Sequence, residues 1–556
     1  MLDAPMRAPF CRGSLLALLL ALAGFAAAPA HAALPLGGAA PLEPLERTNA
    51  LLRIAIGAAA VWVWTGGFGV GRSALAPGGS ARRLALAGLA ALAFTSNYNF
   101  FWWTGLHTHE LFHYYLGSKY FPELGYFRLY ECSVQALGAD GTPVAIGDIT
   151  DLRTKRRRPA AEVLAEAAPC REQFAPGRWA SFRHDVGVFR RLMGDDGFAT
   201  ALLDHGYNPS PVWTLVGRPL ASLVPATPAG LWTLARIDLW LLVALFAAIG
   251  WAFGLEAICL AAIAWGACGH TRYQWTGGAF LRQMWLAAAI AAICLSRRGR
   301  DAAAGALLAL ASLERVFPVL LFAGTGLRQL RVLLRERRLE RRFARFAAGA
   351  ALAGCALVAV GTAVAGRGAG VWREFADNLS AMTAFTPRNG LGLEYLLAYT
   401  KSPPAGLVVP DDPEALETVI QDTKRATFAS RRWLYYGALA GFGVLFVRAA
   451  WRDPGQLEGW ESIAMGAFLI PVLTMPASYY FGFSLAAVPL ATRRPRIGSA
   501  LLVAVLGSSL GIAGWQTGST AFAISSFALL VACAWTLLEL QWPAPKNRAG
   551  YPASAA

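Results

Sequence analysis

Residues 347–365, AAGAALAGCALVAVGTAVA, decide the fold class, because 19 consecutive residues carry no charge. An apolar run of this length suffices for a helix that crosses the hydrocarbon core of a bilayer. Similar Leu- and Ala-rich runs recur along the 556 residues, of which 56% are hydrophobic and 15% charged. Soluble domains carry about 25% charged residues. The sequence therefore predicts an all-α, polytopic bundle of about eleven or twelve transmembrane helices.

The net charge of +16 comes from basic residues that cluster in short segments between the apolar runs. This distribution is typical of the bias of Lys and Arg toward cytoplasmic loops, where they meet anionic lipid headgroups. We therefore expect membrane lipids, and not nucleic acid, as the partner of the basic residues.

The apolar runs and the polar segments between them predict six successive parts of the chain. These are a signal peptide or first transmembrane helix at 1–33, transmembrane helices at 34–104, an extracytoplasmic loop domain at 105–228, transmembrane helices at 229–366, a second extracytoplasmic loop at 367–433, and transmembrane helices with a short cytoplasmic tail at 434–556. The first large loop holds Cys132 and Cys170, which could form a disulfide in an oxidising compartment or stay as free thiols.

An apolar segment at residues 302–326 is interrupted by Glu314-Arg315-Val-Phe-Pro318. Proline breaks a helix, and charged side chains cannot face lipid cheaply. Basic clusters flank both ends of the segment, which a single crossing would not produce. We therefore predict a re-entrant pair of half-helices, in which Glu314, Arg315 and Pro318 have a structural role.

The segment His107-Thr-His-Glu-Leu-Phe-His113 holds three of the seven histidines. A carboxylate partly removed from water suits a general base, so Glu110, with His109 beside it, is the predicted catalytic pair. The same residues match the H-E-x-x-H form of zinc metalloproteases. A third zinc ligand would then come from downstream, with Asp148, Asp151, Asp185 and His205 as candidates. A polar rim without catalytic function is the third interpretation.

Two further stretches of the large loop have more than one interpretation. Asp148 and Asp151 offer an alternative catalytic acid or a cation site, although such a run is more often a solvated turn. Residues 178–192 have aromatic side chains near helical spacing and predict an amphipathic helix on the bilayer surface.

Arginines and tyrosines stand at the predicted outer ends of several helices. Arginine pairs bidentately with phosphate, so together these residues predict an anion site, whereas singly each would be an interfacial anchor. The predicted substrate- and phosphate-binding residues are His113, Lys119, Arg272, Arg373, Arg388, Tyr479 and Tyr480.

Three features resemble the GT-C superfamily of membrane glycosyltransferases, which use polyprenyl-phosphate sugars. They are the acid Glu110 just after a span, the broken Ala/Gly/Leu-rich run that ends at Pro318, and Met475-Pro-Ala-Ser-Tyr-Tyr480. The last two are similar to the bacterial α-mannosyltransferase-like branch. His109-Glu110 stands where many members have paired acids, so the role of base passes to Glu110 alone.

The resemblance implies an inverting transfer of a hexose or pentose, such as mannose, from a polyprenyl-phosphate donor to a glycan or lipid acceptor. The site would face the periplasm at a bacterial inner membrane. No cofactor is required, although the histidines could hold a divalent metal. The alternatives are a transporter or flippase of a lipid-linked or anionic solute, and a membrane-bound H-E-x-x-H metalloprotease.

Overall fold

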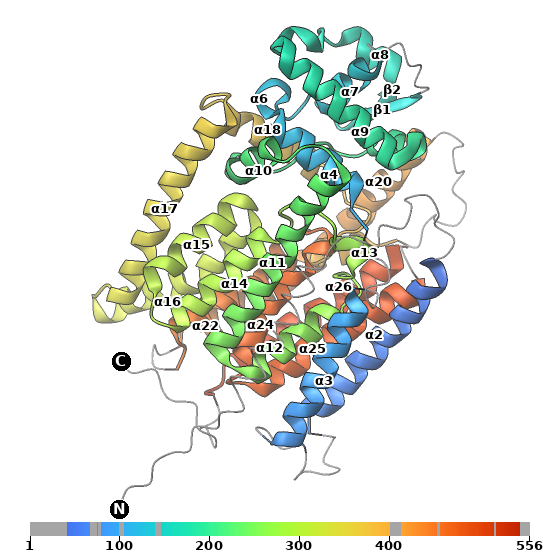
Figure 1. Cartoon of the computed structure of the whole chain (residues 1–556). Coiled ribbons are helices and arrows are strands. Elements are labelled where there is room, and N and C mark those ends of the chain that lie inside the picture. Colours follow the sequence, from blue (N-terminus) through green and yellow to red (C-terminus); the bar gives the residue numbers. More distant parts are fainter. Residues whose placement is uncertain are drawn as a thin grey trace, which may run out of the picture.

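The computed structural model describes residues 42–66, 75, 79–98, 105–138, 146–400, 413–452, 456–515 and 519–544. The expected signal peptide or first transmembrane helix at 1–33 lies outside these residues. Figure 1 shows a bundle of long helices with a smaller domain of short helices on one end. The all-α expectation is confirmed except for one antiparallel hairpin, in which β1 (Asp148–Asp151) pairs with β2 (Arg156–Pro159).

The bundle is built mainly from Ala- and Leu-rich helices. Its elements are α2 (Leu42–Trp64), α3 (Ser80–Asn97), α11 (Pro228–Phe253), α12 (Leu255–Gly266), α13 (Tyr273–Thr276), α14 (Met284–Arg297), α15 (Asp301–Glu314), η5 (Phe317–Leu320), α16 (Leu321–Glu336), α17 (Arg341–Ala365), α21 (Arg432–Ala450), α22 (Gly459–Met465), η6 (Gly466–Leu469), α23 (Ile470–Leu473), η7 (Ser478–Ala486), α24 (Ala487–Ala491), α25 (Pro495–Trp515) and α26 (Ser519–Glu539).

Within the described residues, six helices are long and apolar enough to cross a membrane. They are Pro228–Phe253, Phe317–Glu336, Arg341–Ala365, Arg432–Ala450, Pro495–Gly514 and Ser519–Glu539. Four shorter apolar helices accompany them. The chain is thus a polytopic helical bundle, while eleven or twelve spans stay a prediction.

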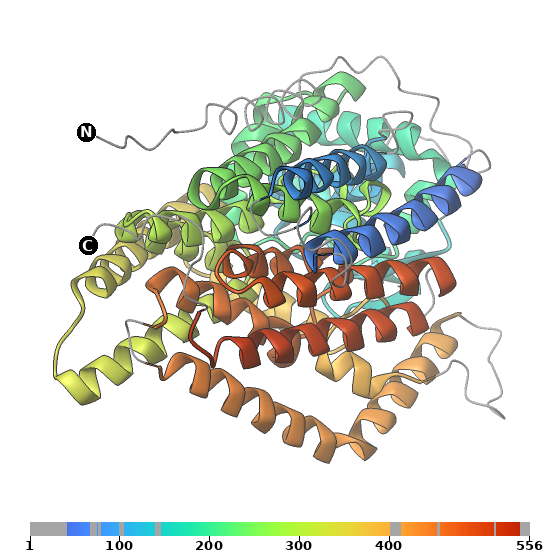
Figure 2. The same cartoon turned by 90° about the horizontal axis from the view of Figure 1, so that it is seen from below.

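Small residues let α15 and α17 pack closely. A Cβ atom on Gly305 would lie 1.9 Å from the carbonyl oxygen of Phe346, and one on Gly349 would lie 2.0 Å from that of Ala302. Contacts between such small residues are the usual way in which membrane helices approach each other. Figure 2 shows a second lateral contact, in which blue α2 lies beside red α25.

The helix break expected at Glu314–Pro318 is confirmed. α15 ends at Glu314, Arg315 is extended with φ −133° and ψ 126°, and a 3₁₀ turn leads into α16. The second helix continues to Glu336 and not to about residue 326, because the basic residues after Gly326 still favour a helix. The re-entrant path of the two helices stays a prediction.

The loop domain, residues 105–228, has a core of its own. Its elements besides the hairpin are α4 (Thr108–Leu111), η3 (Phe112–Leu116), α5 (Gly117–Lys119), α6 (Phe121–Leu124), α7 (Leu129–Gly138), α8 (Ala160–Glu166), η4 (Cys170–Gln173), α9 (Pro176–Ala201) and α10 (Pro211–Leu223). Aromatic side chains dominate this core, among them Phe112, Tyr120, Phe182 and Tyr207, each with 0% exposure.

The helix predicted on the bilayer surface is α9, and its apolar face lies elsewhere. Phe182, Val186 and Phe189 are buried in the core of the loop domain, where Phe189 meets Phe112 edge to face. The amphipathic pattern was right, but protein and not lipid covers the apolar face.

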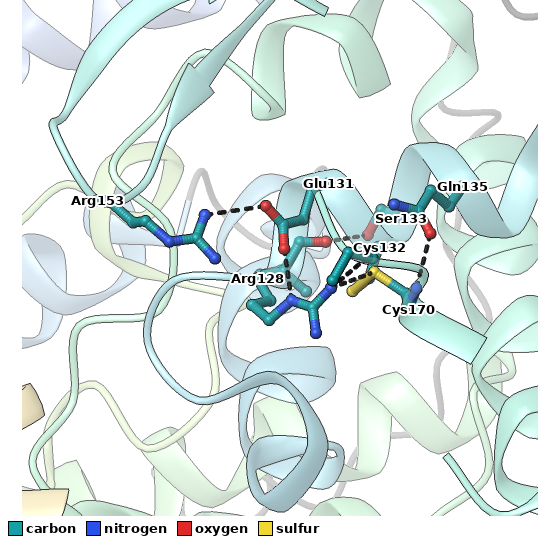
Figure 3. Close-up of a disulfide and its surroundings, with 9 residues drawn as sticks. Arg128, Glu131, Cys132, Ser133, Gln135, Arg153 and Cys170 are labelled. Carbon is teal, nitrogen blue, oxygen red and sulfur yellow. Dashed lines mark hydrogen bonds and ion pairs between the residues drawn. A yellow bond between two sulfur atoms is a disulfide. The ribbon is translucent and has the colours of Figure 1, made fainter. Parts of the chain in front are cut away.

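Cys132 and Cys170 form a disulfide, one of the two states that the sequence left open, and it ties α7 to η4 (Figure 3). Polar contacts surround it. Glu131 accepts hydrogen bonds from Arg128 Nε at 2.5 Å and Arg153 Nη1 at 3.0 Å, and the backbone N–H of Cys170 donates to Gln135 at 2.8 Å.

The second loop, residues 367–433, contributes α18 (Val371–Thr383), α19 (Leu393–Ala398) and α20 (Pro413–Ser430). It contacts the loop domain, since Arg367 Nη1 donates to the carbonyl of Pro122 at 2.9 Å and Asn378 Nδ2 to that of Tyr207 at 3.5 Å. The two loops therefore lie at the same end of the bundle (Figure 1).

Candidate functional site

The histidine-rich segment enters the loop domain as a short, irregular helix. The backbone N–H of His107 donates to the carbonyl of Gly278 at 3.0 Å, and the His107 ring caps α4 by accepting from the N–H of Glu110. After Leu111 the helix widens into a π-helical turn, Phe112–Leu116. Such turns interrupt regular helices mainly at functional sites.

Glu110 is held by Arg282, which precedes α14. Nε of Arg282 donates to Oε1 of Glu110 at 2.8 Å, and Nη2 of Arg282 pairs with Oε2. Both residues are 7% exposed. This bidentate ion pair joins the loop domain to the bundle. The pairing was not predicted from the sequence, although Arg282 is one of the arginines predicted at the outer helix ends.

The backbone around Arg282 is fixed from α11. The carboxylate of Asp238 accepts the backbone N–H groups of Arg282 and Gln283 at 3.0 and 2.9 Å, and Arg282 Nη1 donates to the carbonyl of Trp275 at 2.5 Å. Leu281 has φ +55°, a left-handed conformation that costs a residue with a Cβ about 1–2 kcal/mol. Strained backbone of this kind clusters at functional sites.

A second arginine and three tyrosines lie next to the ion pair. The guanidinium of Arg282 lies 4.9 Å from the ring centre of Tyr479, whose ring lies 4.6 Å from that of Tyr480. Arg315, at the helix break, lies 5.7 Å from the rings of both Tyr480 and Tyr114, and its Nη2 donates to the Tyr114 hydroxyl at 3.1 Å. The broken helix, the Tyr479–Tyr480 segment and the loop domain therefore meet at one place.

Glu314 lies beside Arg315 and is 1% exposed. Within the described part of the chain, neither oxygen of its carboxylate accepts a hydrogen bond of ordinary geometry. Burying a carboxylate without hydrogen-bond partners costs free energy, so the end of a helix alone does not explain a glutamate at position 314.

His109 and His113 point away from Arg282, toward the end of α9. His109 Nε2 and Asp204 Oδ2 are 2.9 Å apart, and one ligand atom from each of His109, His113 and Asp204 lies within 4.8 Å of the others. These residues could hold a metal ion. The sequence predicted His205 or one of three acids as the third ligand and did not indicate Asp204, because no local motif marks a residue 95 positions away from His109.

His113 is enclosed by the loop domain and is 2% exposed. Its Nε2 lies 2.7 Å from the Tyr130 hydroxyl, and burial lowers the pKa of His113 to about 4. The ring is therefore neutral at pH 7 and cannot serve as a cationic phosphate ligand there.

The other predicted anion-binding residues are spread more widely. Lys119 donates to Asp185 at 2.7 Å within the loop domain. Arg272 stacks on Trp275 at 5.7 Å. Arg388 is exposed, but its neighbour Asn389 accepts the N–H of Ser478, which places this segment beside Tyr479. Arg373 is exposed on α18, and no contact among the described residues joins it to the others.

Asp148 and Asp151, the alternative acids, belong to β1. Asp148 is exposed. Asp151 accepts the backbone N–H of Arg153 at 2.9 Å and the hydroxyl of Thr154 at 3.0 Å, so its carboxylate closes the turn of the hairpin. Neither residue joins the set around Arg282.

The site therefore consists of Glu110 and Arg282, with Arg315, Tyr114, Tyr479 and Tyr480 around them, and a separate histidine–aspartate cluster on the loop-domain side. No family model, no curated protein and no solved structure matches the chain.

Proposed function

We propose that this chain is a membrane glycosyltransferase of the GT-C type, which transfers a sugar from a polyprenyl-phosphate donor to an acceptor hydroxyl with inversion. The observation that carries the proposal is the buried Glu110–Arg282 pair, which lies where the loop domain meets the bundle. It places a carboxylate and a strong phosphate ligand side by side at one end of the helices.

The arginine of this pair is suited to the phosphate of the donor. A guanidinium binds phosphate bidentately, as it binds the carboxylate of Glu110 in the absence of substrate. Arriving phosphate would replace Glu110 on Arg282, while Arg315 and the tyrosine hydroxyls supply further hydrogen bonds. These donors would stabilise the negative charge that the phosphate gains as it leaves.

The carboxylate released from Arg282 would then act as the base. Glu110 takes the proton of the acceptor hydroxyl, the acceptor oxygen forms a bond to the anomeric carbon, and the bond from that carbon to the phosphate oxygen breaks. The products are the inverted glycoside and the polyprenyl phosphate. No metal ion is needed for this proton balance.

The helix break offers a place for the lipid chain. Val316 and Val319, on either side of Pro318, are 50% and 49% exposed although both are apolar. Exposed valines next to Arg315 would let the polyprenyl chain lie against the break while its phosphate reaches the arginine. The disulfide of the loop domain supports a periplasmic location at the bacterial inner membrane, because disulfides form in oxidising compartments.

Two other functions have weaker support. A transporter would gather its polar residues near the middle of the membrane, whereas Arg282, Tyr114 and Tyr479 lie at the end of the bundle that carries the loop domain. A metalloprotease has one observation in its favour, the cluster of His109, His113 and Asp204. Its glutamate should face the metal to activate water, but Glu110 is bound to Arg282.

The test is a Glu110→Gln variant assayed with labelled polyprenyl-phosphate hexose or pentose and membranes as the acceptor source. We expect transfer to fall about 10²–10⁴-fold, the usual contribution of a general base. Glu123→Gln is the matched control, because Glu123 is paired with Arg178 at 2.7 Å in the same domain, away from Arg282. It should transfer at nearly the normal rate.

A Glu110→Gln/Arg282→Gln double variant separates chemistry from folding. Glu110→Gln leaves Arg282 buried without its counter-charge, and the second substitution removes that charge. The thermal stability lost in Glu110→Gln should therefore largely return in the double variant, while transfer should not. Wild-type rates in either variant, or no transfer by the natural protein from any such donor, would overturn the proposal. The first outcome would exclude Glu110 as the base.

A further inference from the structure

We propose that His109, His113 and Asp204 form a binding site for one divalent ion of zinc type in the loop domain. The inference does not rest on glycosyl transfer, because these three side chains turn away from the Glu110–Arg282 pair. One ligand atom from each of the three lies within 4.8 Å of the others.

The hydrogen bonds of His113 favour the tautomer in which Nε2 has the lone pair. Its Nδ1 lies 2.7 Å from the carbonyl oxygen of His109 and its Nε2 lies 3.2 Å from that of Ala201; a carbonyl can only accept, and the shorter contact assigns the single proton of the neutral ring to Nδ1. In the neutral ring, Nε2 then presents a lone pair. A carbonyl that holds the distal N–H of a histidine is the usual support of a metal-bound imidazole.

The surroundings of Nε2 agree with this tautomer. The Tyr130 hydroxyl accepts the backbone N–H of Gly206 at 2.9 Å, so its own proton is free to point at Nε2 of His113 at 2.7 Å. A metal ion would take the lone pair that Tyr130 now occupies, so the tyrosine oxygen would have to move away from Nε2 when the ion binds.

The carboxylate of Asp204 already lies beside an imidazole of the set. His109 Nε2 is 2.9 Å from Asp204 Oδ2, so the two side chains converge on one point.

The donor set and its spacing fit zinc. Two imidazole nitrogens and one carboxylate oxygen, with a fourth position open, are typical of zinc sites that keep a water or substrate ligand. Bonds of about 2.0–2.1 Å in a tetrahedron put ligand atoms about 3.3 Å apart, so the observed atoms need to move by little more than about 1 Å. The side chains of His109 and Asp204 are 36% and 44% exposed, which leaves a path for the ion.

The position of Glu110 distinguishes this cluster from the zinc site of an H-E-x-x-H protease, although a π-helical turn separates the two histidines. This turn begins at Phe112, between the two histidines, and the ring centres of His109 and His113 still lie 5.0 Å apart. The glutamate between them faces Arg282 and lies outside the ligand set. An ion here would tie the segment that carries Glu110 to the end of α9.

The experiment uses the purified full-length protein, stripped with a chelator and then titrated with Zn²⁺ by calorimetry and with Co²⁺ by visible absorption. We expect one ion per chain and the absorption of a four-coordinate cobalt site. Both should be lost in His109→Asn and in Asp204→Asn, variants of partly exposed residues that should still fold.

His184→Gln is the matched control, because His184 also contacts a carboxylate on α9, that of Asp185 at 3.2 Å, but has no second histidine. It should bind both ions normally. The proposed site would be overturned if the natural protein binds neither ion, or if His109→Asn and Asp204→Asn bind them as tightly as the natural protein does. Because no sugar donor is present, failure of the transferase proposal would leave this result unchanged.

Discussion

The two ends of α14 carry two different networks of arginine and glutamate. At its start lies the Glu110–Arg282 pair. At its end, fourteen residues or about 21 Å away, Arg297 contacts Glu458 at 3.2 Å. Glu458 belongs to a network around Glu461, which is 0% exposed. We call this the Glu461 network; its members are Arg297, Glu458, Glu461, Arg493 and Arg494.

The carboxylate of Glu461 is fully engaged by groups of the bundle itself. Arg493 Nη1 and the backbone N–H of Glu458 donate to Oε2 at 2.8 and 2.9 Å, and Arg494 donates to Oε1. Glu458 and Glu461 also form a capping box at the start of α22. The network fastens helix ends to each other.

The Glu110 pair uses the same chemistry in a different setting. One arginine, not two, neutralises the glutamate, and the pair joins a residue of the loop domain to one that precedes α14. Beside it lie Arg315 and Glu314, whose carboxylate oxygens accept no hydrogen bond among the described residues. The two networks therefore differ in what holds the glutamate. Arg282 alone engages both oxygens of Glu110, and our proposed function has phosphate replace that carboxylate, whereas two arginines and a backbone N–H hold Glu461 as a clamp between helix ends.

The largest expected effect is the loss of stability in the variant Glu461→Gln, which tests whether the two networks differ. Arg494, 2% exposed, would lose its counter-charge, and the free energy of unfolding should fall by about 3–5 kcal/mol. Thermal unfolding of the detergent-purified protein measures this loss. Glu110→Gln should lose less, because Arg282 alone holds Glu110, whereas Glu461 also accepts hydrogen bonds from Arg493 and from the backbone N–H of Glu458.

Asp422→Asn is the control for the loss of an ion pair as such. Asp422 and Arg425 are 65% and 55% exposed, so this change should cost less than about 1 kcal/mol. If Glu461→Gln unfolds at the temperature of the natural protein, the Glu461 network is no clamp and the contrast with Glu110 fails.

Gly278→Ala sharpens the comparison at the Glu110 end. A Cβ atom there would lie 2.3 Å from the carbonyl oxygen of Gly105 and 2.8 Å from the backbone nitrogen of His107. The segment before Glu110 would have to move, at a cost of about 1–3 kcal/mol beyond the strain of its φ of +66°. Transfer activity should fall with it.

Gly368→Ala isolates the backbone strain. Gly368 also has φ +66°, but a Cβ atom would meet nothing within 4 Å. Both variants therefore bear the free-energy cost of a left-handed conformation, but only in Gly278→Ala does the new Cβ atom clash with the segment before Glu110. Equal losses of stability and activity in the two variants would show that the contact with Gly105 and His107 is unimportant.

The parts of this molecule that sequence predicted are those set by local pattern. Uncharged runs such as 347–365 predicted helices, and Glu314-Arg315 before Pro318 predicted a helix break; the structure confirms both. Cys132 and Cys170 were recognised because both lie in one polar loop. Each of these predictions needs only neighbouring residues or composition.

The parts that sequence missed depend on contacts between distant segments. Nothing near Glu110 indicates that Arg282, 172 residues away, would bind it, and nothing near His109 indicates Asp204. The error on α9 has a different cause. An amphipathic helix has the same pattern whether its apolar face meets lipid or a protein core, so Phe182 and Phe189 could not decide between them.

The smallest expected effect concerns pH and separates the arginines of the Glu461 network from a buried lysine of the loop domain. The Glu461 network uses arginines, which stay charged, whereas the loop domain buries the amine of Lys155. Lys155 is 5% exposed, and its Nζ donates to the carbonyl of His205 at 3.0 Å. Burial lowers the pKa of Lys155 to about 8, against the opposing effect of Asp151 and Asp204.

The sign of the effect follows from this shift. Between pH 8 and the ordinary lysine pKa of about 10.4, the unfolded chain holds the proton and the folded chain does not, so stability rises with pH. Relative to Lys155→Met, the natural protein should gain about 1–2 kcal/mol from pH 7 to 9.5. Thermal unfolding of both proteins at the two pH values measures this difference. Parallel changes would mean that Lys155 stays charged in the folded domain, and the loop domain would then be as insensitive to pH here as the arginines of the Glu461 network.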